Sequence, residues 1–247
     1  MKNSLKSKIK SLRNKLTFWI SKQNSGFLKE IREHELNQIV SKLPEKCKIL
    51  EIGGGSGWQA KNLEKLGYKV FSIDVKDSFY LQEKIFDVQI YDGINIPFKN
   101  KKFDVIFSSN VLEHIKSVDN YQKEISRVLK DDGLAIHIIP SATWRMWTII
   151  TDIMKSWYLA GPHGEHAPNI FIEILFFQKS WWIKQFINND WNVLSARSNY
   201  LFYTGNSIFG SKISIKQRVK LSKILGSSCN IFFLKKSIDK TKQILRK

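Results

Sequence analysis

A glycine-rich segment near residue 50 has the residue types and the spacing of a site for a nucleotide-like ligand. An apolar run ends in the pair Glu51 and Ile52 and leads directly into Gly-Gly-Gly-Ser-Gly. A buried strand that turns into a helix beside a ligand needs residues without a Cβ, because the backbone must approach the ligand closely. We expect Gly53, Gly55 and Gly57 to form this turn, and the Glu51 carboxylate to order it and to reach an ammonium group.

The spacing of these glycines differs from that of a dinucleotide-binding turn. Such a turn requires Gly-x-Gly-x-x-Gly, but the sixth position counted from Gly53 is Trp58. Gly-x-Gly-x-Gly, with an acid two residues before it, resembles motif I of class I S-adenosylmethionine methyltransferases. A glycine turn without a ligand is the alternative for this motif alone, and the polar residues further along the chain argue against it.

Three polar residues follow the next apolar runs, each where a strand is expected to end. They are Asp74, Asp92 and Asn110, and Gly93 follows the second of them. An Asp at such a place can accept both hydroxyls of a ribose. The resemblance, which covers residues 46–140, implies S-adenosyl-L-methionine as cofactor. It assigns Asp74 to the ribose, Asp92 with Gly93 to the adenine, and the Asn110 backbone to the methionine end.

The alternation of apolar runs and helical stretches predicts a doubly wound α/β fold with a largely parallel sheet. We expect strands near 48–53, 69–74, 87–91, 103–108, 134–139, 191–197 and 229–234. We expect helices near 27–43, 58–66, 118–129, 179–189 and 215–225, and a turn at 131–133. The family resemblance implies a seven-stranded Rossmann-like sheet in the order 3-2-1-4-5-7-6, with an antiparallel last strand.

Residues 141–178 interrupt this alternation and are expected to form a substrate-binding insertion in a methyltransferase domain that covers 26–247. The insertion contains a turn-rich loop with His163, Glu165 and His166. A neutral His beside a Glu can act as a general base near pH 7. His163 is therefore the first candidate and His166 the second. The alternative is that these polar residues only stabilise the loop.

Two further groups of residues could serve the reaction. His114 follows Glu113, and in related enzymes this pair lies on the helix after the fourth strand, which makes His114 a secondary candidate base. Trp144, Arg145 and Trp147 follow the fifth strand, and aromatic faces beside an Arg suit a sugar or an anionic glycosyl carrier. A packed aromatic lid is the alternative. The histidines lack a recognisable spacing of metal ligands, so we expect no metal.

The net charge of +18 is concentrated at the two ends of the chain. Residues 1–25 hold seven Lys/Arg and no acid, and residues 212–247 hold eleven with a single acid. The nearly neutral middle argues against nucleic acid as a partner, which would require a basic face at the active cleft. Apolar residues in 1–25 recur at spacings of three and four. They predict a basic amphipathic helix that lies on an anionic membrane or packs on the protein's own core.

The sequence has no run of 18 apolar residues and no secretory signal, so we expect a cytoplasmic protein, peripheral at the inner face of the membrane. The two cysteines, Cys47 and Cys229, are expected to be buried thiols. Neither lies near the fourth or fifth strand, where 5-methylcytosine formation would need one. The residues after the fourth strand, 109–112, also lack the Asn/Asp-Pro-Pro-Tyr/Phe element of enzymes that methylate amino groups of DNA bases.

Small or lipid-linked acceptors remain. The segments 144–147, 163–165 and 201–205 resemble bacterial methyltransferases of surface-polysaccharide assembly. We therefore expect methyl transfer to a sugar oxygen in a surface glycan or its lipid-linked precursor. The alternatives are a lipid or quinone-like small-molecule acceptor, RNA methylation, and a non-catalytic S-adenosylmethionine-binding protein.

Overall fold

The computed structural model describes residues 25–237 apart from 79–80, 83 and 157–160. The amphipathic helix expected over residues 1–25 lies outside this range except for its last residue, and it stays a prediction. The chain folds into two compact units. We call the first the sheet unit (Lys42–Ile138, Ser180–Arg197 and the residues from Ile231) and the second the helical unit (the residues up to Ser41, Ile139–Lys179 and Ser198–Asn230).

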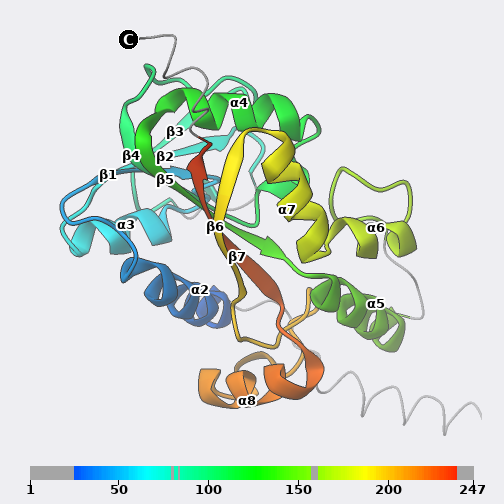
Figure 1. The fold of residues 1–247 in the computed structure, drawn as a ribbon. Coiled ribbons are helices and arrows are strands. Elements are labelled where there is room, and N and C mark those ends of the chain that lie inside the picture. The colour runs from blue at the N-terminus through cyan, green and yellow to red at the C-terminus, as the bar shows by residue number, and fades with distance from the viewer. Residues whose placement is uncertain (1–24, 79–80, 83, 157–160, 238–247) are drawn as a thin grey trace, which may run out of the picture. The chain divides into compact units, whose positions relative to one another are not determined.

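Seven strands form one sheet in the order β3-β2-β1-β4-β5-β7-β6, as expected. The strands are β1 (Lys48–Ile52), β2 (Lys69–Val75), β3 (Val88–Tyr91), β4 (Phe103–Ser109), β5 (Leu129–Pro140), β6 (Trp191–Ser198) and β7 (Cys229–Lys236). The first five strands pair in parallel. β7 runs against β5, because Lys236 at its end donates to the Leu129 carbonyl at the start of β5 (2.7 Å). The last strand is therefore antiparallel (Figure 1).

The helices are α2 (Ser25–Val40), α3 (Trp58–Lys65), α4 (Val118–Val128), α5 (Ala142–Ser156), α6 (Ile170–Phe176), α7 (Lys179–Asn188) and α8 (Ile215–Leu225), with short 3-10 turns η2 (Leu112–His114) and η3 (Gly210–Lys212). α5 and α6 occupy the stretch where no regular element was predicted. None of the helices in the described part of the chain is long and apolar enough to span a membrane.

The central strands of the sheet unit are apolar nearly throughout because both faces of a parallel sheet are buried. Ile49, Leu50, Ile52, Val105 and Ile106 are all fully buried. Figure 1 shows α3 and α4 on opposite faces of this sheet. The polar residues of this sheet therefore lie mainly where the strands end. The glycine loop begins at the end of β1.

The expected turn at 131–133 is instead an irregular stretch inside β5. The register runs from Phe103 opposite Leu129 directly to Val105 opposite Leu134, so residues 130–133 face Asp104 alone. Two ion pairs hold these extra residues, from Lys130 to Asp104 (2.5 Å) and from Lys101 to Asp131 (2.6 Å). Strand β5 therefore starts five residues before the predicted position.

A buried polar network joins the segments of the helical unit. Glu35 on α2 is fully buried and pairs with Arg32 at 2.7 Å. Its other oxygen accepts from Asn199 Nδ2 (2.8 Å) and from the Tyr203 hydroxyl (3.1 Å). The Tyr203 hydroxyl also lies 3.0 Å from the sulfur of Cys229, which is a buried free thiol as expected. These bonds fix α2 against the chain that leads away from β6.

Candidate functional site

The glycine loop is fastened to the end of the neighbouring strand β2. The amides of Gly53 and Gly54 both donate to the Ile73 carbonyl, at 2.9 and 3.1 Å, and the Gly57 amide donates to the Gly54 carbonyl at 2.7 Å. Gly57 has φ +76° and is the N-cap of α3. Because this left-handed conformation is strained for residues with a Cβ, glycine lets α3 begin at Trp58, directly after the loop.

Close packing demands glycine at Gly54, a position to which the sequence analysis gave no role. A Cβ at Gly54 would lie 1.9 Å from Ser72 Oγ and 2.9 Å from Glu51 Oε2. Ser72 lies opposite Glu51 in the pairing of β1 with β2. Gly54 therefore lies directly over the Glu51–Ser72 pair, and the loop packs against the Glu51 carboxylate.

Gly53 and Gly57 contact segments of the chain that the sequence did not indicate. A Cβ at Gly53 would lie 2.2 Å from Val111 Cγ2, in the loop after β4. A Cβ at Gly57 would lie 2.4 Å from Phe86 Cβ. The close approach of Gly57 is thus to the chain before β3. The loop meets the ends of several neighbouring strands at once.

Glu51 lies under the loop with only 2% of its surface exposed. Its carboxylate accepts a hydrogen bond from Ser72 Oγ at 2.7 Å. Burial raises the pKa of Glu51 to about 7, and the nearby Asp74 acts in the same direction against the Ser72 hydrogen bond. A buried carboxylate whose ionised form is disfavoured gains stability when a cation comes close. This environment fits the predicted contact with an ammonium group.

Asp74 is already engaged in holding the loop. Its Oδ2 accepts from the Gly55 amide (2.7 Å) and from Ser78 Oγ (2.9 Å), and its Oδ1 accepts from the Val75 amide (2.7 Å). A carboxylate offers about four acceptor sites, so these bonds leave room for one more. The ribose contact assigned to Asp74 stays a prediction, and loop fastening is a second role that the sequence did not reveal.

Asp92 closes a local turn just after β3. Its carboxylate accepts from the amides of Ile94 (2.8 Å) and Asn95 (2.7 Å) and from Asn95 Nδ2 (2.8 Å). The hydrogen bonds from the side chain and the amide of Asn95 lower the pKa of the Asp92 carboxyl. Gly93 has φ +79° in this turn. The adenine contact of Asp92 and Gly93 stays a prediction.

Asn110 lies just past β4 in the left-handed region, with φ +54°. Its amide donates to the Ile138 carbonyl of β5 at 2.8 Å, which directs the following residues along η2. There Glu113 is fully buried, whereas the His114 side chain keeps 43% of its surface exposed. His114 Nε2 lies 3.8 Å from Glu113 Oε1. His114 belongs to the same unit as the glycine loop, four residues beyond Asn110.

The loop with the other two histidines belongs to the helical unit and is anchored by Glu173. The amides of His163 and Gly164 both donate to Glu173 Oε1 at 2.6 Å. The His163 ring lies 4.8 Å from the Trp144 ring and the His166 ring 6.3 Å from the Phe176 ring, measured between centroids. Glu165, which was expected to assist a base, is exposed. Glu173 therefore holds the backbone of this loop, and the assistance of a base by Glu165 stays a prediction.

Arg145 is wrong as the cation of a sugar-binding surface, and Trp147 stays a prediction. Arg145 is buried, with 2% of its side chain exposed. It forms an ion pair with Glu173 and donates to the Gly161 carbonyl at 2.8 Å. Trp147 Nε1 donates to the Leu225 carbonyl at 3.0 Å. The polar atoms that would have met an acceptor are thus used inside the helical unit.

Sequence reasoning could have found some of the missed residues. Ser72 is the small polar residue of the second apolar run, and pairing that run with the first in register places it beside Glu51. Glu173 lies in the first turn of α6, four residues after the N-cap Asn169. Acids are favoured at that position because the helix dipole is positive there. Its link to Arg145 had no sequence signal.

Comparisons with known proteins agree with this geometry. Residues 50–137 match the family model of a methyltransferase domain. The chain is 27% identical over 129 residues to the ubiquinone biosynthesis O-methyltransferase of Bartonella bacilliformis, which covers 47% of this chain and 51% of that protein. It is 25% identical over 172 residues to the enzyme of the same name from Rickettsia bellii, covering 64% and 71%.

Among solved structures, an S-adenosylmethionine-dependent methyltransferase from Aquifex aeolicus aligns over 90% of this chain and 97% of its own, with a TM-score of 0.54 at 15% identity. At that identity the likeness concerns the fold. The chain spans about half the length of the first of these curated relatives. Residues 50–137 are thus similar to a methyltransferase domain, and the fold is that of solved S-adenosylmethionine-dependent methyltransferases.

Proposed function

We propose that this protein transfers a methyl group from S-adenosylmethionine to an oxygen atom of a small organic acceptor. The observation that carries this proposal is the glycine loop, which covers the buried carboxylate of Glu51 and is tied to Asp74 through the Gly55 amide. Loop residues without a Cβ allow close approach of the cofactor, and Glu51 offers a negative charge to its ammonium group. The residues present therefore fit this cofactor.

When bound, S-adenosylmethionine supplies a methyl group on a positively charged sulfur, which is a good leaving group. The protein's task is to hold the acceptor oxygen about 3 Å from that carbon and in line with it. A hydroxyl acceptor must also lose its proton, and a neutral imidazole can accept it near pH 7. His114, in the unit that holds the glycine loop, and His163, in the helical unit, are the two candidates for this base.

The observations favour a phenolic, quinone-like acceptor. The curated relatives that match the chain are named as O-methyltransferases of ubiquinone biosynthesis. A phenol ionises near pH 10, well below an aliphatic hydroxyl, so a histidine base suffices for it. A sugar acceptor is less favoured, because Arg145, the cation expected to meet it, is buried in an ion pair with Glu173.

The test is a transfer assay with methyl-labelled S-adenosylmethionine and three acceptor classes: catechols with short prenyl chains, lipid-linked sugars, and total RNA. We expect label in the catechol alone. Label only in the sugar would favour the glycan acceptor instead. Label only in RNA would exclude both the phenolic and the glycan acceptor. If titration calorimetry detects neither S-adenosylmethionine nor S-adenosylhomocysteine binding, the cofactor assignment itself fails.

Histidine variants identify the base in the same assay. We expect the His114→Gln or the His163→Gln variant to lose at least about a hundredfold in turnover, the usual contribution of a general base, with cofactor affinity unchanged. His34→Gln, on α2, is the matched control and should keep full activity. If both candidate variants keep wild-type turnover at every pH from 6 to 9, neither histidine is the base.

We also propose that the basic residues 1–25 bind anionic membranes and bring the enzyme to an apolar acceptor. Their alternation of Lys/Arg with apolar residues supports this. Flotation with vesicles that contain 30% anionic lipid should retain the full chain and lose a variant that starts at Gly26. Equal flotation of the two proteins would remove this proposal.

A further inference from the structure

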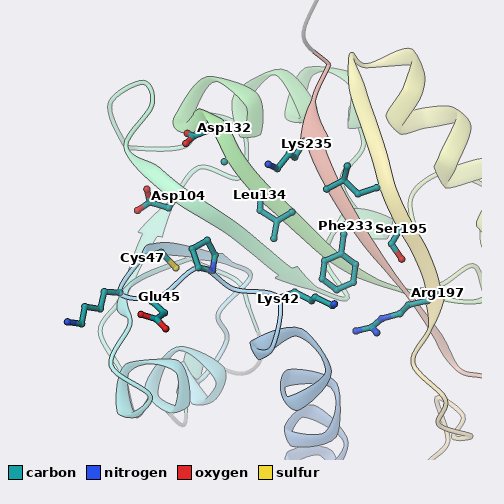
Figure 2. A pocket seen from close by; sticks show the side chains of 14 residues that line it. Lys42, Glu45, Cys47, Asp104, Asp132, Leu134, Ser195, Arg197, Phe233 and Lys235 are labelled. Atoms are coloured by element: carbon teal, nitrogen blue, oxygen red, sulfur yellow. The ribbon is translucent and has the colours of Figure 1, made fainter.

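A pocket of about 550 Å³ opens in the sheet unit, at the edge opposite the glycine loop. Cys47, which directly precedes β1, lines it together with Asp104 near the start of β4 (Figure 2). The glycine loop follows the carboxyl end of β1, whereas this pocket lies where β1 and β4 begin. Its volume is within the range of roughly 300–1,000 Å³ that small-ligand pockets occupy. The proposed methyl transfer makes no use of it.

The pocket has an apolar floor. Phe233 of β7 and Leu134 of β5 line it, with Phe233 95% buried (5% exposed). Leu194 of β6 also lines it and keeps 51% of its surface exposed. A half-exposed leucine beside a buried aromatic ring is a surface on which an apolar group gains by burial.

Two cations lie at the Phe233 end of this floor. Figure 2 shows the side chains of Lys42 and Arg197 extending toward each other beneath the Phe233 ring. The guanidinium carbon of Arg197 lies 5.2 Å from the centroid of that ring. Within the described parts of the chain, Lys42 forms no ion pair. The charge of Lys42 is therefore available to a ligand.

The acidic side chains of the pocket lie elsewhere. Glu45, Asp104 and Asp132 line the end away from Phe233 (Figure 2). Asp104 forms an ion pair with Lys130 at 2.5 Å. Burial acts to raise the pKa of the Asp104 carboxyl, but the hydrogen bonds from Lys130 and from the Lys48 amide lower this pKa overall. The Cys47 thiol is nearly buried, and burial raises its pKa to about 11, so it adds no charge. The pocket is thus cationic at one end.

We infer that this pocket binds a small carboxylic acid with an aromatic or branched apolar body. The carboxylate lies between Lys42 and Arg197, whose planar guanidinium matches the two oxygens of a carboxylate. The apolar body rests on Phe233 and the two leucines. The ligand binds at a site separate from that of the cofactor, so both are held at the same time.

The test uses 2-naphthoate as the probe and 2-naphthalenemethanol as its uncharged counterpart, titrated by calorimetry into the full-length protein saturated with S-adenosylhomocysteine. We expect 2-naphthoate to bind one-to-one and the alcohol to bind at least about tenfold more weakly, the factor that corresponds to one charge-assisted hydrogen bond. Equal affinity for the two probes would overturn the inference, as would displacement of 2-naphthoate by S-adenosylhomocysteine.

Variants of the two lining cations test where the probe binds. Arg197→Gln and Lys42→Gln should each weaken 2-naphthoate at least about fivefold, whereas Lys65→Gln on the exposed side of α3 should bind it normally. Lys42→Gln and Lys65→Gln should melt as the parent does, and Arg197→Gln slightly lower, because its guanidinium also contacts the Phe233 ring. Unchanged affinity in both lining variants would show that the probe binds elsewhere. Binding that weakens as protein concentration rises, with dimers in sedimentation, would show instead that a second copy of the chain covers this face.

Discussion

Replacing Arg145 with methionine tests whether one buried ion pair holds the His163 loop. Arg145 and Glu173 each keep only 2% of the side chain exposed. Methionine fills a similar volume but leaves the Glu173 carboxylate in the interior without its cation. It also removes the donor to the Gly161 carbonyl. The change therefore acts at both ends of the segment 161–164.

The expected loss of stability is large for a single substitution. Breaking a buried ion pair by removing one partner costs about 3–5 kcal/mol, because the remaining charge stays buried and unpaired. At about 2–4 °C per kcal/mol for a chain of this size, the melting midpoint of the variant should fall by roughly 6–20 °C. Glu173→Gln should also destabilise, because the Arg145 guanidinium stays buried without its anion, although the amide oxygen can still accept from His163 and Gly164.

The assay pairs thermal melting with hydrogen exchange at the His163 and Gly164 amides. Lys155→Met is the matched control, because it removes a cation from an exposed position of the same helix, α5, and should melt within about 2 °C of the parent. Exchange of both amides should accelerate in the Arg145→Met variant. If that variant melts with the control and both amides keep their protection, the pair neither stabilises the unit nor anchors the loop.

Three further outcomes follow from the glycine loop. Gly54→Ala should weaken S-adenosylmethionine at least about tenfold in calorimetry, since its Cβ would meet Ser72 Oγ, and wild-type affinity would show that the loop adapts freely. Burial raises the pKa of Glu51 from its ordinary 4.5 to about 7, so the stability due to its neutral form is present below pH 4.5 and lost as the pH rises through 7. The urea midpoint of the parent should therefore decline more steeply from pH 5 to pH 8 than that of the Glu51→Gln variant, and parallel profiles would contradict this. Asp74→Ala should cost about 1–3 kcal/mol of cofactor affinity, whereas the exposed Asp87→Ala should bind as the parent does; equal affinities for both variants would remove Asp74 from the site.

Elements that bury both faces were readily predicted from the sequence. The runs around Ile49 and Val105 are apolar nearly throughout, and the strands observed there begin and end within two residues of the predicted positions. The start of β5 was missed because Leu129 continues the apolar spacing of the preceding helix, through Ile125 and Val128. Its pairing with Phe103 in the sheet prevails over that local pattern.

The site was predictable where it depends on neighbours in sequence and unpredictable where it depends on packing. The glycines that follow a strand are visible in the sequence itself. The requirement for glycine at position 54 arises from Ser72, which lies close only because of the register between β1 and β2. Glu165 was paired with His163 because it is two residues away. The acid that holds the backbone of the loop is Glu173, because the first turn of α6 returns to the loop. Long-range ion pairs of this kind leave no periodic pattern.

The internal hydrogen bonds of the glycine loop have a consequence for the timing of catalysis. The amides of Gly53, Gly54, Gly55 and Gly57 all have partners within the folded chain, so the loop is preorganised. Ordering a flexible loop on binding would subtract about 1–2 kcal/mol per residue from the affinity, and here that entropy is lost during folding instead. Cofactor entry and product departure then need no rearrangement of the loop.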